Sequence, residues 1–121
     1  MADNVLERAL TDLLSIYMNY DDTTIERLLI DPNRVEKERV IKLDDLEVLI
    51  YSNDHNPPHF HVKAKGKNID AKFLIETGEF MKGEIDSKNL KRIKAYYMSP
   101  KTKIIMQLIW DKRLQNQHAN K

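Results

Sequence analysis

The feature that most constrains the fold is the change to strand-like patterning at Val40. From there, short apolar-containing runs cover residues 40–43, 46–51, 60–64, 69–76 and 80–85. In the longer runs apolar residues take every second position, which is typical of half-buried strands because successive side chains point to opposite faces. Short turns, such as the one at Gly66-Lys67-Asn68, make neighbouring strands antiparallel. We therefore expect an antiparallel β-meander of four to five short strands.

The first 39 residues show helical spacing. Apolar residues recur at steps of three and four from about Asp3 to Asn19, which predicts an amphipathic helix. Asp22-Thr23 is expected to cap a second, short helix, and Asp31-Pro32-Asn33 to end it. We interpret residues 1–39 as an N-terminal helical extension of the sheet domain.

Two further helices are predicted after the sheet. Asp86 or Ser87 can cap the first, and Ser99-Pro100 combines an N-cap with a proline at the first position of the second. The last helix is expected to end near Leu114, before a frayed polar tail. Residues 40–121 are thus predicted to form an α+β domain in which two C-terminal helices pack on the sheet.

The composition excludes several classes of protein. The chain has no cysteine, so disulfides, thiol catalysis and cysteine-based zinc sites are excluded. Three glycines do not suffice for a phosphate-binding glycine loop. The N-terminal residues lack the pattern of a signal peptide, and no apolar run is long enough to span a membrane. We expect a cytoplasmic protein with no membrane partner.

Charge is distributed unevenly along the chain. Residues 1–60 carry 13 acidic and 6 basic side chains, whereas residues 61–121 carry 6 acidic and 14 basic ones. Either the two halves attract each other, within one fold or across a homodimer, or the basic half binds RNA or DNA. Candidate phosphate-binding residues near the helix–helix corner are Lys91, Arg92 and Lys94.

The segment from Ser52 to His61 concentrates the candidate chemistry. Its sequence, SNDHNPPHFH, holds three of the four histidines. His59 and His61 are two apart in an extended segment, so both leave the same face, while Phe60 and Val62 face the core. We expect an outer stripe of two imidazoles followed by the ammonium groups of Lys63 and Lys65.

Three interpretations of this segment remain open. In the first, His55, His59 and His61 are acid–base residues of a metal-independent ribonuclease, with lysines stabilising the phosphate and no cofactor required. In the second, these histidines and Asp54 bind a divalent transition metal such as Zn²⁺, Ni²⁺ or Mn²⁺. In the third, Asp54 and Asn56 form side-chain turns and the histidines bond to the backbone.

The nine residues DHNPPHFHV, Asp54–Val62, resemble a bacterial family called domain of unknown function 4160. The resemblance extends over about Leu46–Leu114, through AKFLIETGEFMKGEI, LKRIKAYY and IIMQLIW. It implies a small bacterial cytoplasmic protein and a candidate toxin–antitoxin component with a cognate small protein encoded nearby. No proven role for the signature residues comes with it.

The leading hypothesis is therefore a toxin–antitoxin-type protein that binds or acts on nucleic acid, RNA in particular. Its polar site would comprise His55, His59 and His61, with Lys63, Lys65 and the corner residues meeting phosphate. The alternative is a non-catalytic module that uses the same segment to bind a partner protein or a metal.

Overall fold

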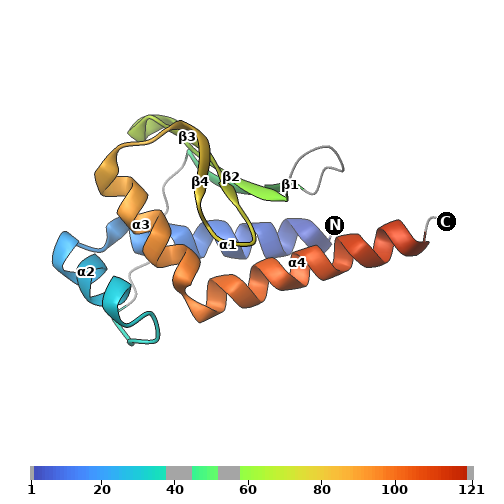
Figure 1. The fold of residues 1–121 in the computed structure, drawn as a ribbon, viewed down its shortest axis with the longest axis horizontal. Coiled ribbons are helices and arrows are strands. Elements are labelled where there is room, and N and C mark those ends of the chain that lie inside the picture. The colour runs from blue at the N-terminus through green and yellow to red at the C-terminus, as the bar shows by residue number, and fades with distance from the viewer. Residues whose placement is uncertain (1, 38–44, 52–57, 120–121) are drawn as a thin grey trace.

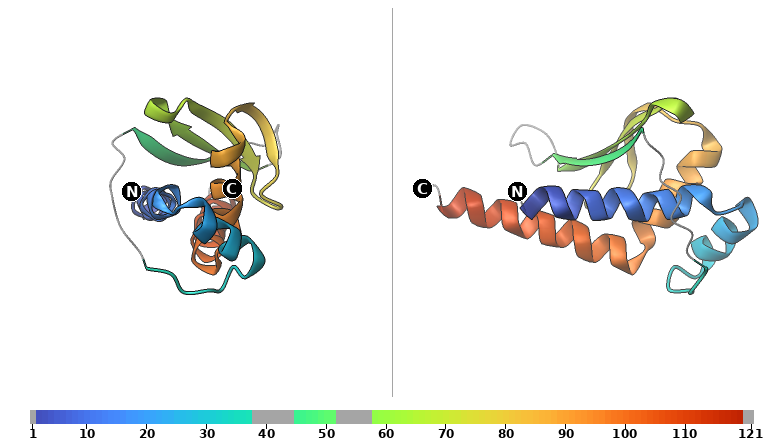
Figure 2. Two further views of the ribbon diagram at one scale, coloured as in Figure 1. Left: turned by 90° about the vertical axis from the view of Figure 1, so that its left-hand side faces the viewer. Right: turned by 180° about the vertical axis from the view of Figure 1, so that it is seen from behind.

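The protein has a layer of helices under one face of a four-stranded sheet (Figures 1 and 2). The computed structural model describes residues 2–37, 45–51 and 58–119, without the side chains of residues 2–4 and 113–119. The elements in chain order are α1 (Ala2–Asn19), α2 (Asp22–Ile30), β1 (Leu46–Tyr51), β2 (His59–Ala64), η1 (Lys65–Lys67), β3 (Ile69–Leu74), β4 (Phe80–Glu84), α3 (Ser87–Met98) and α4 (Pro100–Ala119). The predicted α+β class is confirmed.

The sheet is the expected antiparallel meander, with strand order β1-β2-β3-β4. In its register Val48 lies opposite Val62, and Val62 opposite Ala71, so their side chains share the inner face. The expected short strand at residues 40–43 lies outside the described residues. Asn68, with a φ of 56°, supplies the left-handed residue that ends η1 and turns the chain into β3.

The helix boundaries correct two details of the prediction. The N-cap of α2 is Asp21 rather than Asp22, and its carboxylate accepts a hydrogen bond from the Thr24 backbone N–H at 2.8 Å. This bond lowers the pKa of Asp21. Helix α4 continues past Leu114 to Ala119, because the polar residues after Leu114 include neither glycine nor proline to end it. Within the part of the chain that the structure describes, no helix has the length and apolar character needed to cross a membrane.

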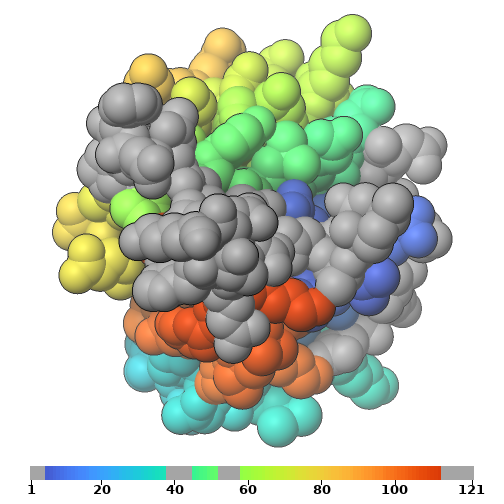
Figure 3. Space-filling model, turned by 90° about the vertical axis from the view of Figure 1, so that its right-hand side faces the viewer, coloured from blue at the N-terminus to red at the C-terminus, as the bar shows by residue number. Residues whose placement is uncertain are grey.

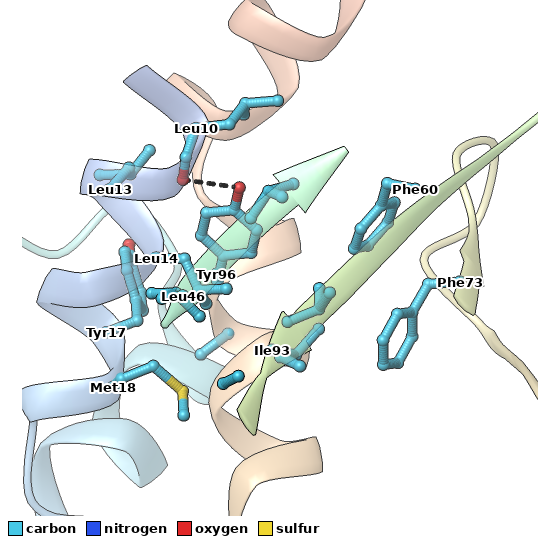
Figure 4. Packing of buried hydrophobic residues seen from close by; sticks show 14 of the residues in the cluster. Leu10, Leu13, Leu14, Tyr17, Met18, Leu46, Phe60, Phe73, Ile93 and Tyr96 are labelled. Carbon is cyan, nitrogen blue, oxygen red and sulfur yellow. Dashed lines mark hydrogen bonds between the residues drawn. The ribbon is translucent and has the colours of Figure 1, made fainter. Parts of the chain in front are cut away.

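Helix α1 lies at the centre of the core, beside β1, α3 and α4. Its Leu10 and Leu14 are fully buried in one cluster with Phe60 and Phe73 of the sheet and with Tyr96 of α3 (Figure 4). The Tyr96 hydroxyl donates a hydrogen bond to the Leu10 carbonyl oxygen at 3.0 Å. The N-terminal helical segment therefore shares the hydrophobic core of the sheet.

Candidate functional site on the outer face of the sheet

The side chains of His59 and His61 lie on the face of the sheet opposite the helices. Phe60, which lies between them, and Val62, which follows His61, are fully buried in the core, so the alternation along β2 sends both imidazoles outward. The ring of Tyr51 on β1 contacts both, at centroid distances of 5.2 Å from His59 and 6.1 Å from His61. The common face predicted for this histidine pair is thus what the structure shows.

Both imidazoles are much less exposed than a surface stripe would be. His59 and His61 are only 6% and 8% exposed. They lie on an inner strand, where Tyr51 and Leu74 flank His59 and Leu49 and Lys72 flank His61. Cross-strand neighbours on one face are close enough to cover each other, and Tyr51 also stacks on His59 with an angle of 26° between the rings. The two imidazoles of the expected outer stripe are therefore covered by their neighbours, whereas its lysines, Lys63 and Lys65, are exposed.

His61 has a carboxylate partner on the neighbouring strand. Its Nε2 is hydrogen-bonded to Oδ1 of Asp70, which belongs to β3 and lies one step diagonally from His61 in the sheet. This hydrogen bond is the main cause that lowers the pKa of Asp70, with smaller contributions from the positive charges of Lys63 and Lys72. The Asp70 carboxylate itself is largely exposed, so the pair lies at the edge of solvent.

Lysines lie around the histidines, although not in the predicted line. Lys63 follows on β2 and is exposed, as expected, but β2 ends at Ala64 and Lys65 belongs to η1. The register instead adds Lys72 of β3, opposite His61, and Lys82 of β4, opposite Lys72. Sequence reasoning missed Tyr51, Asp70, Lys72 and Lys82, and the signal that finds them is the strand pairing.

The corner residues on α3 have different environments. Lys94 is exposed, and Lys91 is exposed in an ion pair with Glu26 of α2, at 3.2 Å. Arg92 is buried: its guanidinium donates to the Tyr20 carbonyl oxygen at 2.7 Å and to the Asp22 carboxylate at 2.9 Å. Arg92 thus joins α3 to the α1–α2 connection and does not face solvent as a phosphate ligand would. These pairs join the acidic N-terminal half to the basic C-terminal half.

The predicted site residues Asp54 and His55 lie outside the described residues. Among the residues that are described, no group of three or more histidine, aspartate or glutamate side chains is arranged to hold a metal ion. His59, His61 and Asp70 therefore do not form a metal site by themselves, and the metal interpretation depends on Asp54 and His55.

A comparison with protein families matches residues 46–107 to the family described as Domain of unknown function (DUF4160). The match begins at the first residue of β1, includes all four strands and α3, and ends within α4. It therefore contains both histidines, their tyrosine and aspartate partners, and the lysines around them. No curated protein and no solved structure matches the chain. Because the family model covers half of the chain, this protein belongs to the DUF4160 family.

Proposed function

We propose that the protein is a metal-independent ribonuclease that binds single-stranded RNA on the outer face of its sheet. His59 and His61 would be the acid–base pair. They lie two residues apart on a strand, so their Cα atoms are separated by about 6.6 Å and both side chains leave the same face. A neutral imidazole would take the proton of the 2′-hydroxyl, and an imidazolium would protonate the leaving oxygen.

The observation that carries this proposal is the contact between His61 and Asp70. A catalytic base needs a fixed ring orientation and a defined tautomer, and a carboxylate bonded to one ring nitrogen provides both. With Nε2 turned to Asp70, Nδ1 of His61 is the nitrogen left for substrate. Tyr51 stacks against the second ring, that of His59, and limits its rotation.

The outer face carries acidic side chains in the row of Lys63, namely Glu47, Asp70 and Glu84, but the row of His61 carries lysines, which support an anionic substrate. Lys72 and Lys82 lie in one row with His61, and Lys63 lies between His61 and η1. Ammonium groups at this position would stabilise the negative charge that develops on a phosphate in the transition state. The exposed part of the Tyr51 ring offers a surface on which a base could stack.

We further propose that this activity is that of a toxin–antitoxin-type component, inhibited by a cognate small protein encoded nearby. Family membership motivates this hypothesis, and the face of the sheet opposite the helices is the surface such a partner would cover. Expression of the chain alone should slow growth, and co-expression of the neighbouring gene should relieve it. Harmless expression of an active ribonuclease would contradict the toxin role.

The test of catalysis is cleavage of single-stranded RNA in the presence of EDTA. The rate should follow a bell-shaped pH profile, because one histidine must be neutral and the other charged. His59→Ala and His61→Ala should each abolish cleavage. The control is Lys67→Ala, which changes an exposed residue of η1 and should leave the rate of cleavage unchanged. Far-ultraviolet circular dichroism of each variant controls for folding, and full activity in a folded His59→Ala variant would refute the proposal.

The burial of both imidazoles favours one second candidate, a non-catalytic binding module. In that case the histidines would be packing residues, and the outer face would bind a partner protein or, with Asp54 and His55, a metal. RNA would then stay intact at every pH, and elemental analysis of untagged protein would show whether Zn²⁺, Ni²⁺ or Mn²⁺ is bound in stoichiometric amount.

A further inference from the structure

A groove of about 580 Å³ lies between one end of the sheet and the two C-terminal helices. Figure 3 shows the end of the molecule toward which α4 points, with β1 in green above the orange and red of α4. The strand side of the groove includes Leu74, Ile75 and Glu76, and the helix side includes Tyr97, Lys103 and Trp110. Its volume falls within the range of about 300–1,000 Å³ that is usual for small-molecule sites.

One wall of this groove is an aromatic ring held in a fixed position. The Tyr97 ring is parallel to that of Phe60, at 6.1 Å between centroids and 4° between planes. Its hydroxyl donates a hydrogen bond to the Ile75 carbonyl oxygen at 2.6 Å, and Lys103 Nζ lies 5.7 Å from the ring centroid. Because its hydroxyl is already bonded, Tyr97 offers a ligand mainly its apolar surface. Trp110, the sole tryptophan of the chain, adds a second aromatic side chain.

The polar groups of the groove are of three kinds. Lys103 carries a positive charge and Glu76 a negative charge. Gln107 carries an amide whose Nε2 donates a hydrogen bond to Asp111 Oδ1 at 2.8 Å, and its carbonyl oxygen can accept one from a ligand. The pKa of the Tyr97 hydroxyl is raised, mainly by burial and to a smaller extent by the nearby negative charge of Glu76. A matching ligand combines a flat ring, N–H donors for the carboxylate and amide, and an anionic group for the lysine. A nucleotide with an exocyclic amino group has all three.

The groove reaches the end of the sheet at which His59 begins β2. Leu74, one of its lining residues, lies directly opposite His59 in the register of β2 and β3, and Pro58 directly precedes His59. The Pro58 carbonyl oxygen also accepts a hydrogen bond from the Ile75 backbone N–H at 3.1 Å, which ties the two strand segments at the rim. A chain with its phosphate at His59 could therefore place an adjacent base in the groove.

We propose that this groove binds one amino-bearing base of a single-stranded RNA substrate, between the aromatic side chains and the polar groups of α4. The inference rests on the proposed function, since it assigns a base site beside the same histidine pair. It also specifies the substrate, because a base can enter the groove only when it is free of a base-paired stack.

Trp110 fluorescence provides a direct test, since no other tryptophan contributes to the signal. Titration with adenosine 5′-monophosphate should change the emission and saturate, whereas ribose 5-phosphate, which lacks the base, should leave it unchanged. Uridine 5′-monophosphate, which lacks an exocyclic amino group, should bind more weakly. Lys103→Ala should raise the Kd for adenosine 5′-monophosphate about tenfold through loss of a charged contact. The matched control, Lys67→Ala, removes a lysine far from the groove and should leave the Kd unchanged.

The same variants separate this inference from the proposed catalysis. In His59→Ala the fluorescence titration should be retained while cleavage is lost. Saturable binding of adenosine 5′-monophosphate without any RNA cleavage would refute the ribonuclease proposal and would still support the groove as a nucleotide site. RNA cleavage without a saturable fluorescence change, or an equal loss of affinity in Lys103→Ala and Lys67→Ala, would overturn the groove as a base site.

Discussion

His61 and Asp70 are partners across two strands of the sheet, with His61 Nε2 bonded to a carboxylate oxygen of Asp70. The imidazole is nearly buried, whereas the carboxylate is largely exposed. Asp70 lies directly opposite Lys63, so the bond is a diagonal one that follows from the register of β2 and β3. The hydrogen bond fixes the ring of His61 in the candidate site. It also lowers the pKa of Asp70, and this shift makes the stability of the protein depend on pH.

Asp70→Asn should change the acid stability of the protein. The bond to His61 lowers the folded-state pKa of Asp70 below its ordinary value of 3.8. The stabilisation is therefore present above pH 3.8 and is lost as the pH falls through the folded-state pKa. We expect the melting temperatures of wild type and Asp70→Asn to differ at neutral pH and to converge below pH 3.8. Thermal melts from pH 7 to pH 2 measure this, and a constant difference over that range would contradict it.

Only part of this site could be predicted from the sequence. The alternation of β2 suffices to place His59 and His61 on one face, because strand geometry has a period of two. The choice of Asp70 as a partner needs the register between β2 and β3, which depends on η1 and the turn at Asn68. The low exposure of the imidazoles depends on neighbours from two other strands, which sequence proximity does not reveal.

Arg92 should matter for stability more than its neighbour Lys91. Arg92→Met would remove the buried hydrogen bonds to the Tyr20 carbonyl oxygen and to Asp22, at an expected cost of about 2–3 kcal/mol in the free energy of unfolding. Lys91→Met, the control, loses only an exposed ion pair with Glu26 and should cost at most about 0.5 kcal/mol. Urea unfolding of both variants measures the difference. Equal costs would show that the Arg92 contacts do not stabilise the fold.

Long-range contacts such as those of Arg92 are the part of the fold that the sequence did not predict. Composition and spacing predicted the strands and helices well, since each has its own periodicity. The position of α1 depends on long-range contacts, such as the hydrogen bond from Tyr96 to the Leu10 carbonyl and the packing of Leu14 in the core. Arg92 likewise looked like part of a solvated basic cluster, because the sequence does not show that Asp22 and Tyr20 lie against it.

Gly78 should not tolerate a side chain. Its φ is +77°, and a Cβ at this position would overlap the Tyr97 ring. Gly78→Ala should therefore cost at least about 2 kcal/mol in the free energy of unfolding, from backbone strain and displacement of Tyr97. Gly66→Ala is the matched control, because among the described residues its Cβ would meet only Asp45 Oδ2, at an ordinary 3.6 Å. Urea unfolding should separate the two variants, and a neutral Gly78→Ala would show that Tyr97 can move freely.

Thr102 should be replaceable by valine with a gain in stability. Its side chain is fully buried in the first turns of α4, and its hydroxyl oxygen has no hydrogen-bond partner among the described residues. Thr102→Val keeps the shape while removing a buried, unsatisfied hydroxyl, which should raise the free energy of unfolding by about 1 kcal/mol.

Thr11→Val is the opposite case and serves as the control. The Thr11 hydroxyl accepts a hydrogen bond from the Val48 backbone N–H at 3.1 Å and donates one to the Glu7 carbonyl oxygen at 3.0 Å. Loss of the Thr11 hydroxyl would leave the Val48 backbone N–H without this acceptor. Thr11→Val should therefore lower the free energy of unfolding by about 1–2 kcal/mol. Calorimetric melting temperatures should therefore shift in opposite directions for the two variants. A decrease for Thr102→Val would show that its hydroxyl does form a stabilising hydrogen bond in solution.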